Sequence, residues 1–164
     1  MNPFQGGWVI LLSVGVAMVL AVVHLPETVP QWIGWLRPAW MVLVVFYWVM
    51  AIPHRLGLIS AWCLGLLVDV LLADPLGVNG LCLAALTFVT WSLYERLRMY
   101  SVAQQGALLF LLVLGVELVR LIAQVFARNG ELTWMIVWPA VTSTLVWPFV
   151  YSALRRLRRQ FDVS

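Results

Sequence analysis

Long apolar runs, separated by short polar or proline-containing segments, make up most of the chain. The runs cover residues 8–25, 38–53, 56–73, 76–94, 103–127 and 132–153. A helix that spans a membrane needs about 20 mostly apolar residues, with a range of about 17–25. The pattern therefore predicts an all-α integral membrane protein with six transmembrane helices, in a single domain over residues 1–164 that ends in a basic tail at 154–164.

Short turns separate the second, third and fourth runs. "PHR" follows the second run, and "ADPLG" joins the third to the fourth. Pro53 and Pro75 mark these turns, because proline has no amide donor and disfavours a helical conformation in the residue before it. We therefore expect tight antiparallel hairpins. The first run has no basic region before it and no small-residue cleavage site, so we expect a retained span rather than a signal peptide.

The composition points to the same class of protein. Hydrophobic residues make up 63% of the chain and charged residues 10%, and the mean hydropathy is +0.97. A soluble domain carries about 25% charged residues, so the composition by itself indicates a membrane protein. With so few charges, the net charge of +3 gives no indication of nucleic-acid binding. Cys63 and Cys82 lie inside apolar runs, and we expect buried thiols without a disulfide.

The arginines are distributed unevenly between the two sides of the predicted bundle. With both termini on one side, that side carries Arg55, Arg96, Arg98, Arg155, Arg156, Arg158 and Arg159. The other side carries Arg37 and Arg128. Because cytoplasmic segments of membrane proteins are enriched in Lys and Arg, both termini are predicted to lie in the cytoplasm.

The third predicted helix combines a stripe of small residues with a buried acid. At a spacing of four residues it carries Gly57, Ala61, Gly65 and then Asp69. Small residues at this spacing let another helix approach closely, which favours association in lipid. The fourth helix has Gly77 and Gly80 near its start, so these residues predict a helix-packing seam with Asp69 at its end.

The fifth predicted helix supplies an expected partner for this acid. Glu117 and Arg120 lie one turn apart, and Arg120 differs from Asp69 in membrane depth by roughly 4–5 Å at 1.5 Å per residue. We expect Arg120 to pair with Glu117 and, across the bundle, with Asp69. These three residues then form an intramembrane polar clamp. The alternative for an acid in a membrane is a proton or cation relay, which usually calls for several polar groups around a midplane cavity.

No arrangement in the sequence predicts an enzyme. His24 and His54 fall at opposite membrane faces, and no Ser–His pair or paired carboxylates converge. We therefore predict no catalytic residues, no metal ligands and no cofactor.

Two stretches carry a resemblance to a known family. "LRPAWMVLVVFYWVMAIPHR" at residues 36–55 and "GLLVDVLLADPLGVNGL" at residues 65–81 together resemble the MreD family of rod shape-determining membrane proteins. Trp147–Pro148 before a basic end adds to the likeness, which covers essentially the whole chain. The resemblance implies a non-enzymatic scaffold of the bacterial inner membrane that helps direct lateral peptidoglycan synthesis and rod shape.

The resemblance also implies partners. These are the bitopic protein MreC as the main one, the MreB filament, and RodA with its penicillin-binding transpeptidase; a homodimer within the complex is also expected. The family is similar in fold to the six-helix substrate-binding subunits of energy-coupling-factor transporters, which leaves a vitamin-binding membrane subunit as the alternative. The first outer loop offers such a subunit Glu27, Gln31 and Arg37 as polar groups.

The cytoplasmic side carries the remaining candidate residues. In the tail, Leu154, Leu157 and Phe161 recur at helical spacing, and four arginines lie among them: Arg155, Arg156, Arg158 and Arg159. A basic amphipathic end attracts anionic lipids, at about 1 kcal/mol per arginine near the surface. Together with His54 and Arg55, these arginines are predicted to contact lipid headgroups or cytoplasmic partners, or to act only as a topology anchor.

Overall fold

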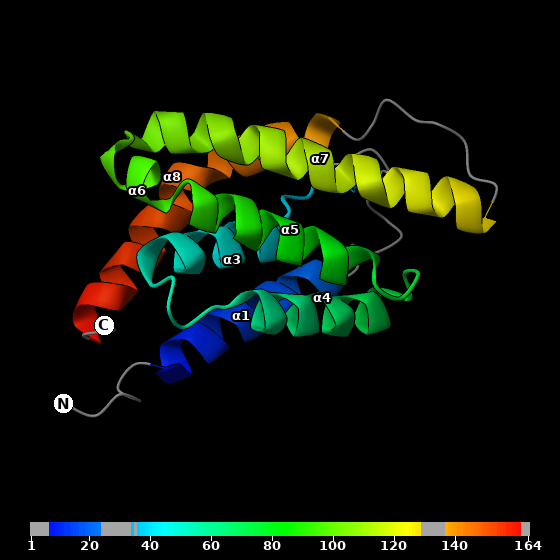
Figure 1. Ribbon diagram of the computed structural model, residues 1–164, viewed down its shortest axis with the longest axis horizontal. Helices are drawn as coiled ribbons and strands as arrows, with labels where there is room; N and C mark the ends of the chain where they lie inside the picture. The colour runs from blue at the N-terminus through cyan, green and yellow to red at the C-terminus, as the bar shows by residue number, and fades with distance from the viewer. Residues whose placement is uncertain (1–6, 24–33, 35, 129–136, 162–164) are drawn as a thin grey trace.

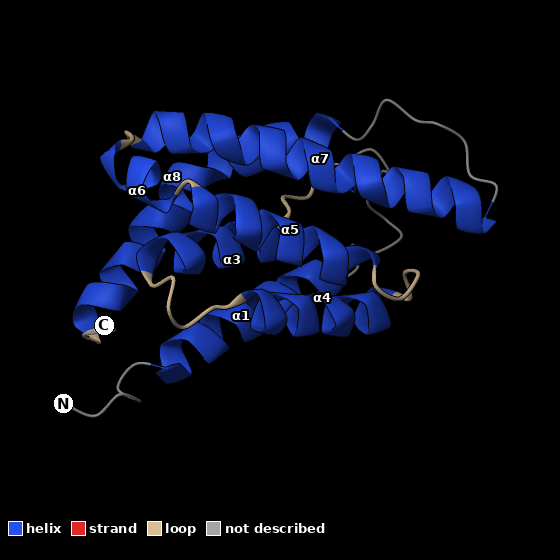
Figure 2. Cartoon of the chain, in the orientation of Figure 1, coloured by secondary structure: helices blue, strands red, loops and turns tan. Residues whose placement is uncertain are grey.

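A computed structural model describes residues 7–23, 34, 36–128 and 137–161, and all secondary structure in these segments is helical (Figures 1 and 2). The helices are α1 (Gly7–Val22), α3 (Trp40–Ala51), α4 (Leu58–Leu72), α5 (Val78–Ser92), α6 (Tyr94–Met99), α7 (Val102–Arg128) and α8 (Val137–Gln160). The all-α class predicted from the apolar runs is therefore confirmed over the described residues.

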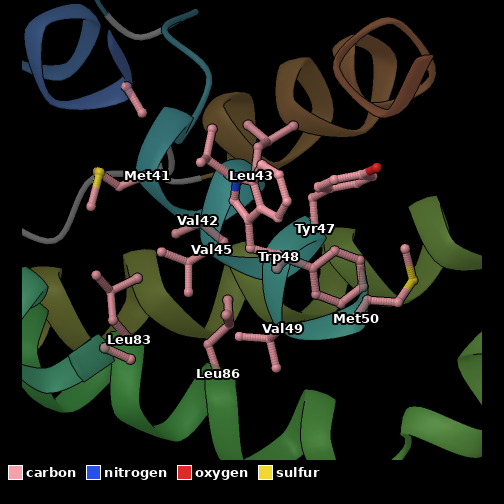
Figure 3. Close-up of a cluster of buried hydrophobic side chains, with 14 of the residues drawn as sticks. Met41, Val42, Leu43, Val45, Tyr47, Trp48, Val49, Met50, Leu83 and Leu86 are labelled. Atoms are coloured by element: carbon pink, nitrogen blue, oxygen red, sulfur yellow. The ribbon is translucent and has the colours of Figure 1, made fainter. Parts of the chain in front are cut away.

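Helix α3 forms the centre of the bundle. Every residue from Met41 to Met50 is buried, because α3 is apolar on all sides and α1, α5 and α8 pack around it. Figure 3 shows these side chains packed together with Leu83 and Leu86 of α5. Two polar contacts fix α3: Trp48 Nε1 donates to Ser13 Oγ of α1 at 2.8 Å, and the Ala39 amide donates to Ser143 Oγ of α8 at 2.9 Å.

The outer surface of the bundle is also strongly apolar. Leu11 of α1, Ile59 of α4 and Phe149 of α8 are 73%, 79% and 76% exposed, and large apolar side chains of α5 and α7 are exposed as well. Soluble monomers rarely present contiguous apolar patches larger than a few hundred Å². The surface is therefore suited to lipid or to protein partners.

One described helix is long and apolar enough to cross a membrane by itself. It covers Val102–Phe126, 25 residues, within α7. The apolar helices α1, α3, α4 and α5 have 12 to 16 residues. At 1.5 Å per residue they are roughly 18–24 Å long, against a hydrocarbon core of about 30 Å.

Two helix boundaries differ from the sequence prediction. The predicted helix 76–94 ends at Ser92, and a separate helix, α6, follows it. Helix α6 carries Glu95 in its first turn and Arg96 and Arg98 in its last, an arrangement that complements the helix dipole. The predicted tail at 154–164 is not separate from the last helix, because α8 continues through it to Gln160.

The start of α1 and the end of α8 lie at one end of the bundle, together with α6 and the connection between α3 and α4 (Figure 1). The turn between α4 and α5 lies at the opposite end. The arginines of the tail and of α6 are therefore separated by the length of the bundle from Asp69.

Candidate functional site

Asp69 is fully buried near the end of α4, where it caps the start of α5. Its Oδ2 accepts the backbone N–H of Gly77 at 2.8 Å, and its Oδ1 accepts the backbone N–H of Asn79 at 2.9 Å. The first amides of a helix have no intrahelical partner, and their dipole favours an anion. Gly77, at the N-cap of α5, has no side chain for this purpose, so a carboxylate from the preceding helix fills the role.

The backbone of the turn is shaped around the same residue. The amides of Ala73 and Asp74 both donate to the carbonyl oxygen of Asp69, the second at 3.1 Å. Ala73 adopts a left-handed conformation with φ 52°, and Gly77 has φ 97°. Glycine reaches this region without the steric cost that a Cβ brings, which accounts for Gly77 at the entry to α5.

Asn79 joins this turn to α7 and was not predicted from the sequence as a site residue. The side chain is buried, and its Nδ2 donates to Asp69 Oδ1 at 2.8 Å and to Asp74 Oδ2 at 3.2 Å. Its Oδ1 accepts from Arg120 Nε at 2.7 Å. Both the donor and the acceptor group of the amide are therefore used. A polar residue at the first turn of an apolar helix, directly after the "DPLG" turn, was the available signal.

Arg120 and Glu117 complete the polar cluster on α7. Arg120 Nη1 lies 3.0 Å from Glu117 Oε1, and both side chains are largely buried. The direct contact between Arg120 and Asp69 expected from their membrane depth is replaced by a bridge, because Asn79 stands between them. The result is a continuous polar chain across α4, α5 and α7.

The small residues play different roles from one position to the next. A Cβ built on Gly65 would lie 2.5 Å from the carbonyl oxygen of Asn79, so α4 and α5 meet here backbone to backbone. A Cβ built on Gly80 would lie 3.1 Å from Cδ1 of Trp62, and Ala61 is fully buried. Nothing lies within 4 Å of a Cβ on Gly57 or Gly77. The close contact between α4 and α5 is therefore shorter than the predicted seam. Gly57 lies outside it, and a glycine at position 77 is explained by its positive φ and not by helix packing.

A cavity of about 250 Å³ opens beside the polar cluster. Arg37, Glu117 and Arg120 supply its charged lining, and most of the rest is apolar. Arg37 Nη2 also donates to the carbonyl oxygens of Leu20 and Ala21 at 2.7 and 3.1 Å, which satisfies acceptors at the end of α1. Glu27 and Gln31, the other polar groups expected near this cavity, lie outside the described residues.

The predicted cytoplasmic contact residues lie at the other end of the bundle. His54 is exposed, and the guanidinium of the half-buried Arg55 lies beside Gly7 at the start of α1. Along α8, Arg155, Arg156 and Arg159 are exposed and Arg158 is half-buried.

The cysteines are both free thiols. Cys82 is buried as expected, but the expectation of a buried thiol is wrong for Cys63, which is exposed on α4.

The hydrogen bonds of the polar cluster join α4, α5 and α7 to one another. The carboxylate of Asp69 accepts two backbone amides and one side-chain amide at 2.8–2.9 Å, all from α5 and its N-cap. Among the described residues, no group of three His, Cys, Asp or Glu side chains is placed to hold a metal ion.

Comparison with known proteins gives two matches to one family. A family model described as "rod shape-determining protein MreD" matches residues 2–157. The rod shape-determining protein MreD of Haemophilus influenzae is 33% identical over 136 residues, which cover 82% of this chain and 84% of that protein. No solved structure matches the chain.

Proposed function

Because the chain belongs to the rod shape-determining MreD family, we propose that it is a non-enzymatic membrane scaffold that binds MreC and helps direct lateral peptidoglycan synthesis. The MreB filament and RodA with its penicillin-binding transpeptidase are the further partners of this scaffold. Its place is the bacterial inner membrane. The use of Asp69 as a helix cap supports a structural role for the acid in place of a relay.

The observation that carries this proposal is an apolar groove between α1 and α8. Its volume is about 340 Å³, and α1 contributes Trp8, Leu12, Val16 and Leu20 while α8 contributes Val150 and Leu157, among others. From Trp8 to Leu20 the groove follows α1 for about 18 Å at 1.5 Å per residue. A groove of this length and polarity can take apolar side chains from one face of a single membrane helix, such as that of the bitopic protein MreC.

The proposed topology is one membrane domain with six spans and both termini in the cytoplasm. The exposed apolar side chains of the helices around α3, and the excess of arginine at the end where α1 begins and α8 ends, support it. Bilayers thin locally around spans that are shorter than the hydrocarbon core, at a modest cost in free energy. Reporter fusions at both termini test the topology, and a reporter that is active outside the cytoplasm at either end contradicts it.

Affinity purification of the full chain in a mild detergent tests the scaffold function. The expected result is co-purification of MreC, with RodA and its transpeptidase in smaller amounts. Recovery of an energy-coupling ATPase module without MreC overturns the proposal.

A second candidate function is that of a small-molecule-binding subunit of a transporter. The 250 Å³ cavity supports it, because the charged side chains of Arg37, Glu117 and Arg120 converge on an otherwise largely apolar lining, as in many ligand sites. The same purification separates the two candidates, since only this one requires the ATPase module.

A further inference from the structure

The hairpin of α4 and α5 presents a short apolar face to the outside of the bundle. Large apolar side chains are exposed along α4 from Ile59 to Leu71 and along α5 from Leu81 to Trp91. Each helix has 15 residues, so this hairpin face is roughly 22 Å long at 1.5 Å per residue. The apolar part of α7, Val102–Phe126, has 25 residues and is roughly 37 Å long. The two lengths therefore differ by about 15 Å.

Polar residues limit the hairpin face at both ends. In the turn after α4, Asp74 Oδ2 accepts from Asn79 Nδ2 at 3.2 Å, and the exposed Leu76 of the same turn forms the outer edge of the face. At the other end α5 stops at Ser92, and the exposed residues Glu95 and Arg96 follow in α6. The exposed ring of Trp91 beside this end is typical of a membrane–water interface.

A hydrogen bond fixes the register between the hairpin and α7. Arg120 Nε donates to Asn79 Oδ1 at 2.7 Å, so the first turn of α5 lies near the level of Arg120. The apolar segment of α7 continues for six more residues to Phe126, which adds roughly 9 Å beyond this level. Figure 1 shows α7 running past the turn between α4 and α5. Most of the difference in length therefore lies at the end of the bundle that holds this turn.

Tilt cannot match both lengths to one bilayer. The hydrocarbon core is about 30 Å thick. A tilt of about 35° reduces the height of the α7 segment to about 30 Å, but it also reduces the height of the hairpin face to about 18 Å. Long basic side chains can reach the headgroups from a short span, yet residues 72–78 at the outer end of the hairpin include no Lys or Arg.

We propose that the α4–α5 face borders a locally thinned bilayer and selects phospholipids with short acyl chains, while α7 borders a bilayer of ordinary thickness. This inference rests on the proposed six-span topology, because only a spanning hairpin meets both leaflets. The thinning lies mainly on the outer side, where α7 extends past the hairpin. The protein thereby creates a difference in bilayer thickness between two of its own faces, and such a difference sorts neighbouring proteins by the length of their spans.

The test compares the lipids that lie beside two labelled cysteines of the full chain. Cys63, which is exposed on α4, carries a fluorophore in a Cys82→Ala variant. Leu111→Cys places the same fluorophore on the exposed surface of α7, in a variant that also has Cys63→Ala and Cys82→Ala. Both proteins are reconstituted in vesicles that mix phosphatidylcholines with short myristoleoyl and long erucoyl chains. Brominated chains of one length at a time quench the fluorophore, so quenching reports which lipid lies next to each label.

At Cys63 we expect the short-chain lipid to be preferred by about threefold or more, because each Å of mismatch adds to the cost of a long-chain neighbour. At position 111 we expect a short-chain preference below about 1.5-fold. Equal preferences at the two positions overturn the proposal. Absence of quenching by either lipid at Cys63 also overturns it, since another protein or a second copy then covers the face. The reporter fusions test the topology separately, so equal preferences in a chain with both termini in the cytoplasm overturn this inference alone.

A further pair of variants tests whether length is the cause of the preference. Leu76 is 75% exposed, so its replacement should leave the fold intact. Leu76→Arg gives the outer end of the hairpin a side chain that reaches the headgroups of a thicker bilayer, and the short-chain preference at Cys63 should fall by about half. Leu76→Gln lacks this reach and should keep the preference. An unchanged preference in the arginine variant contradicts length mismatch as its origin.

Discussion

Arg120 of α7 donates from Nε to Asn79 Oδ1 of α5 at 2.7 Å, and this contact joins the α4–α5 hairpin to the rest of the polar cluster. Asn79 also donates to Asp69, so the side-chain amide of Asn79 links α4 to α7 through hydrogen bonds. In a low-dielectric interior such a network is strong when every member has a partner, and costly when one is removed.

Replacement of Asp69 should destabilise the protein more than replacement of its neighbour. Asp69→Ala leaves the amides of Gly77 and Asn79 without their acceptor, and we expect a loss of at least about 2 kcal/mol in the free energy of unfolding. Asp74→Ala removes a 3.2 Å contact to Asn79 and should cost less. Unfolding in bicelles measures both, and equal losses contradict the capping role.

Asp69 and Arg120 should be coupled only through Asn79. In a double-mutant cycle, Asp69→Asn and Arg120→Gln should show a coupling of about 0.5 kcal/mol or more in the natural background. The coupling should vanish in the Asn79→Ala background, because the bridging amide is gone. A coupling that persists in that background indicates a direct interaction between the two charged groups.

Gly65 of α4 and Gly57, its N-cap residue, should respond differently to replacement by alanine. Gly65→Ala forces a Cβ into the backbone of α5, and we expect a loss of about 1–3 kcal/mol in the free energy of unfolding. Gly57→Ala, which meets open space, should stay within about 0.5 kcal/mol. Thermal denaturation in detergent measures the difference. Similar melting temperatures for the two variants contradict the close approach at Gly65.

The groove between α1 and α8 should determine recovery of MreC. Val16→Trp fills the groove, whereas Val19→Trp adds the same bulk to an exposed position of α1 that does not line it. We expect Val16→Trp to reduce co-purification of MreC by about tenfold, equivalent to about 1.4 kcal/mol of binding free energy, and Val19→Trp to leave it unchanged. Equal recovery of MreC with both variants excludes the groove as the docking site. If Val16→Trp displaces bound lipid and leaves MreC recovery unchanged, the occupant of the groove is an acyl chain.

Local features of the sequence, such as prolines between apolar runs, predicted much of the fold. The prolines at 53 and 75 placed the ends of α3 and α4 within three residues, because they act on the adjoining backbone directly. The roles of Gly57 and Gly65 were not separable, because both lie on one stripe and only the crossing point of α4 and α5 distinguishes them. Asn79 was missed for a related reason: one amide in an apolar run gives no periodic signal, and its partners come from two other helices.

The turn between α4 and α5 satisfies its backbone donors within its own hairpin. The carboxylate and carbonyl of Asp69 together accept the amides of Ala73, Asp74, Gly77 and Asn79, all within eleven residues of one another. Backbone donors that reach lipid unpaired cost several kcal/mol each. Because these donors are matched within the hairpin, the turn does not depend on α7 for its backbone hydrogen bonds.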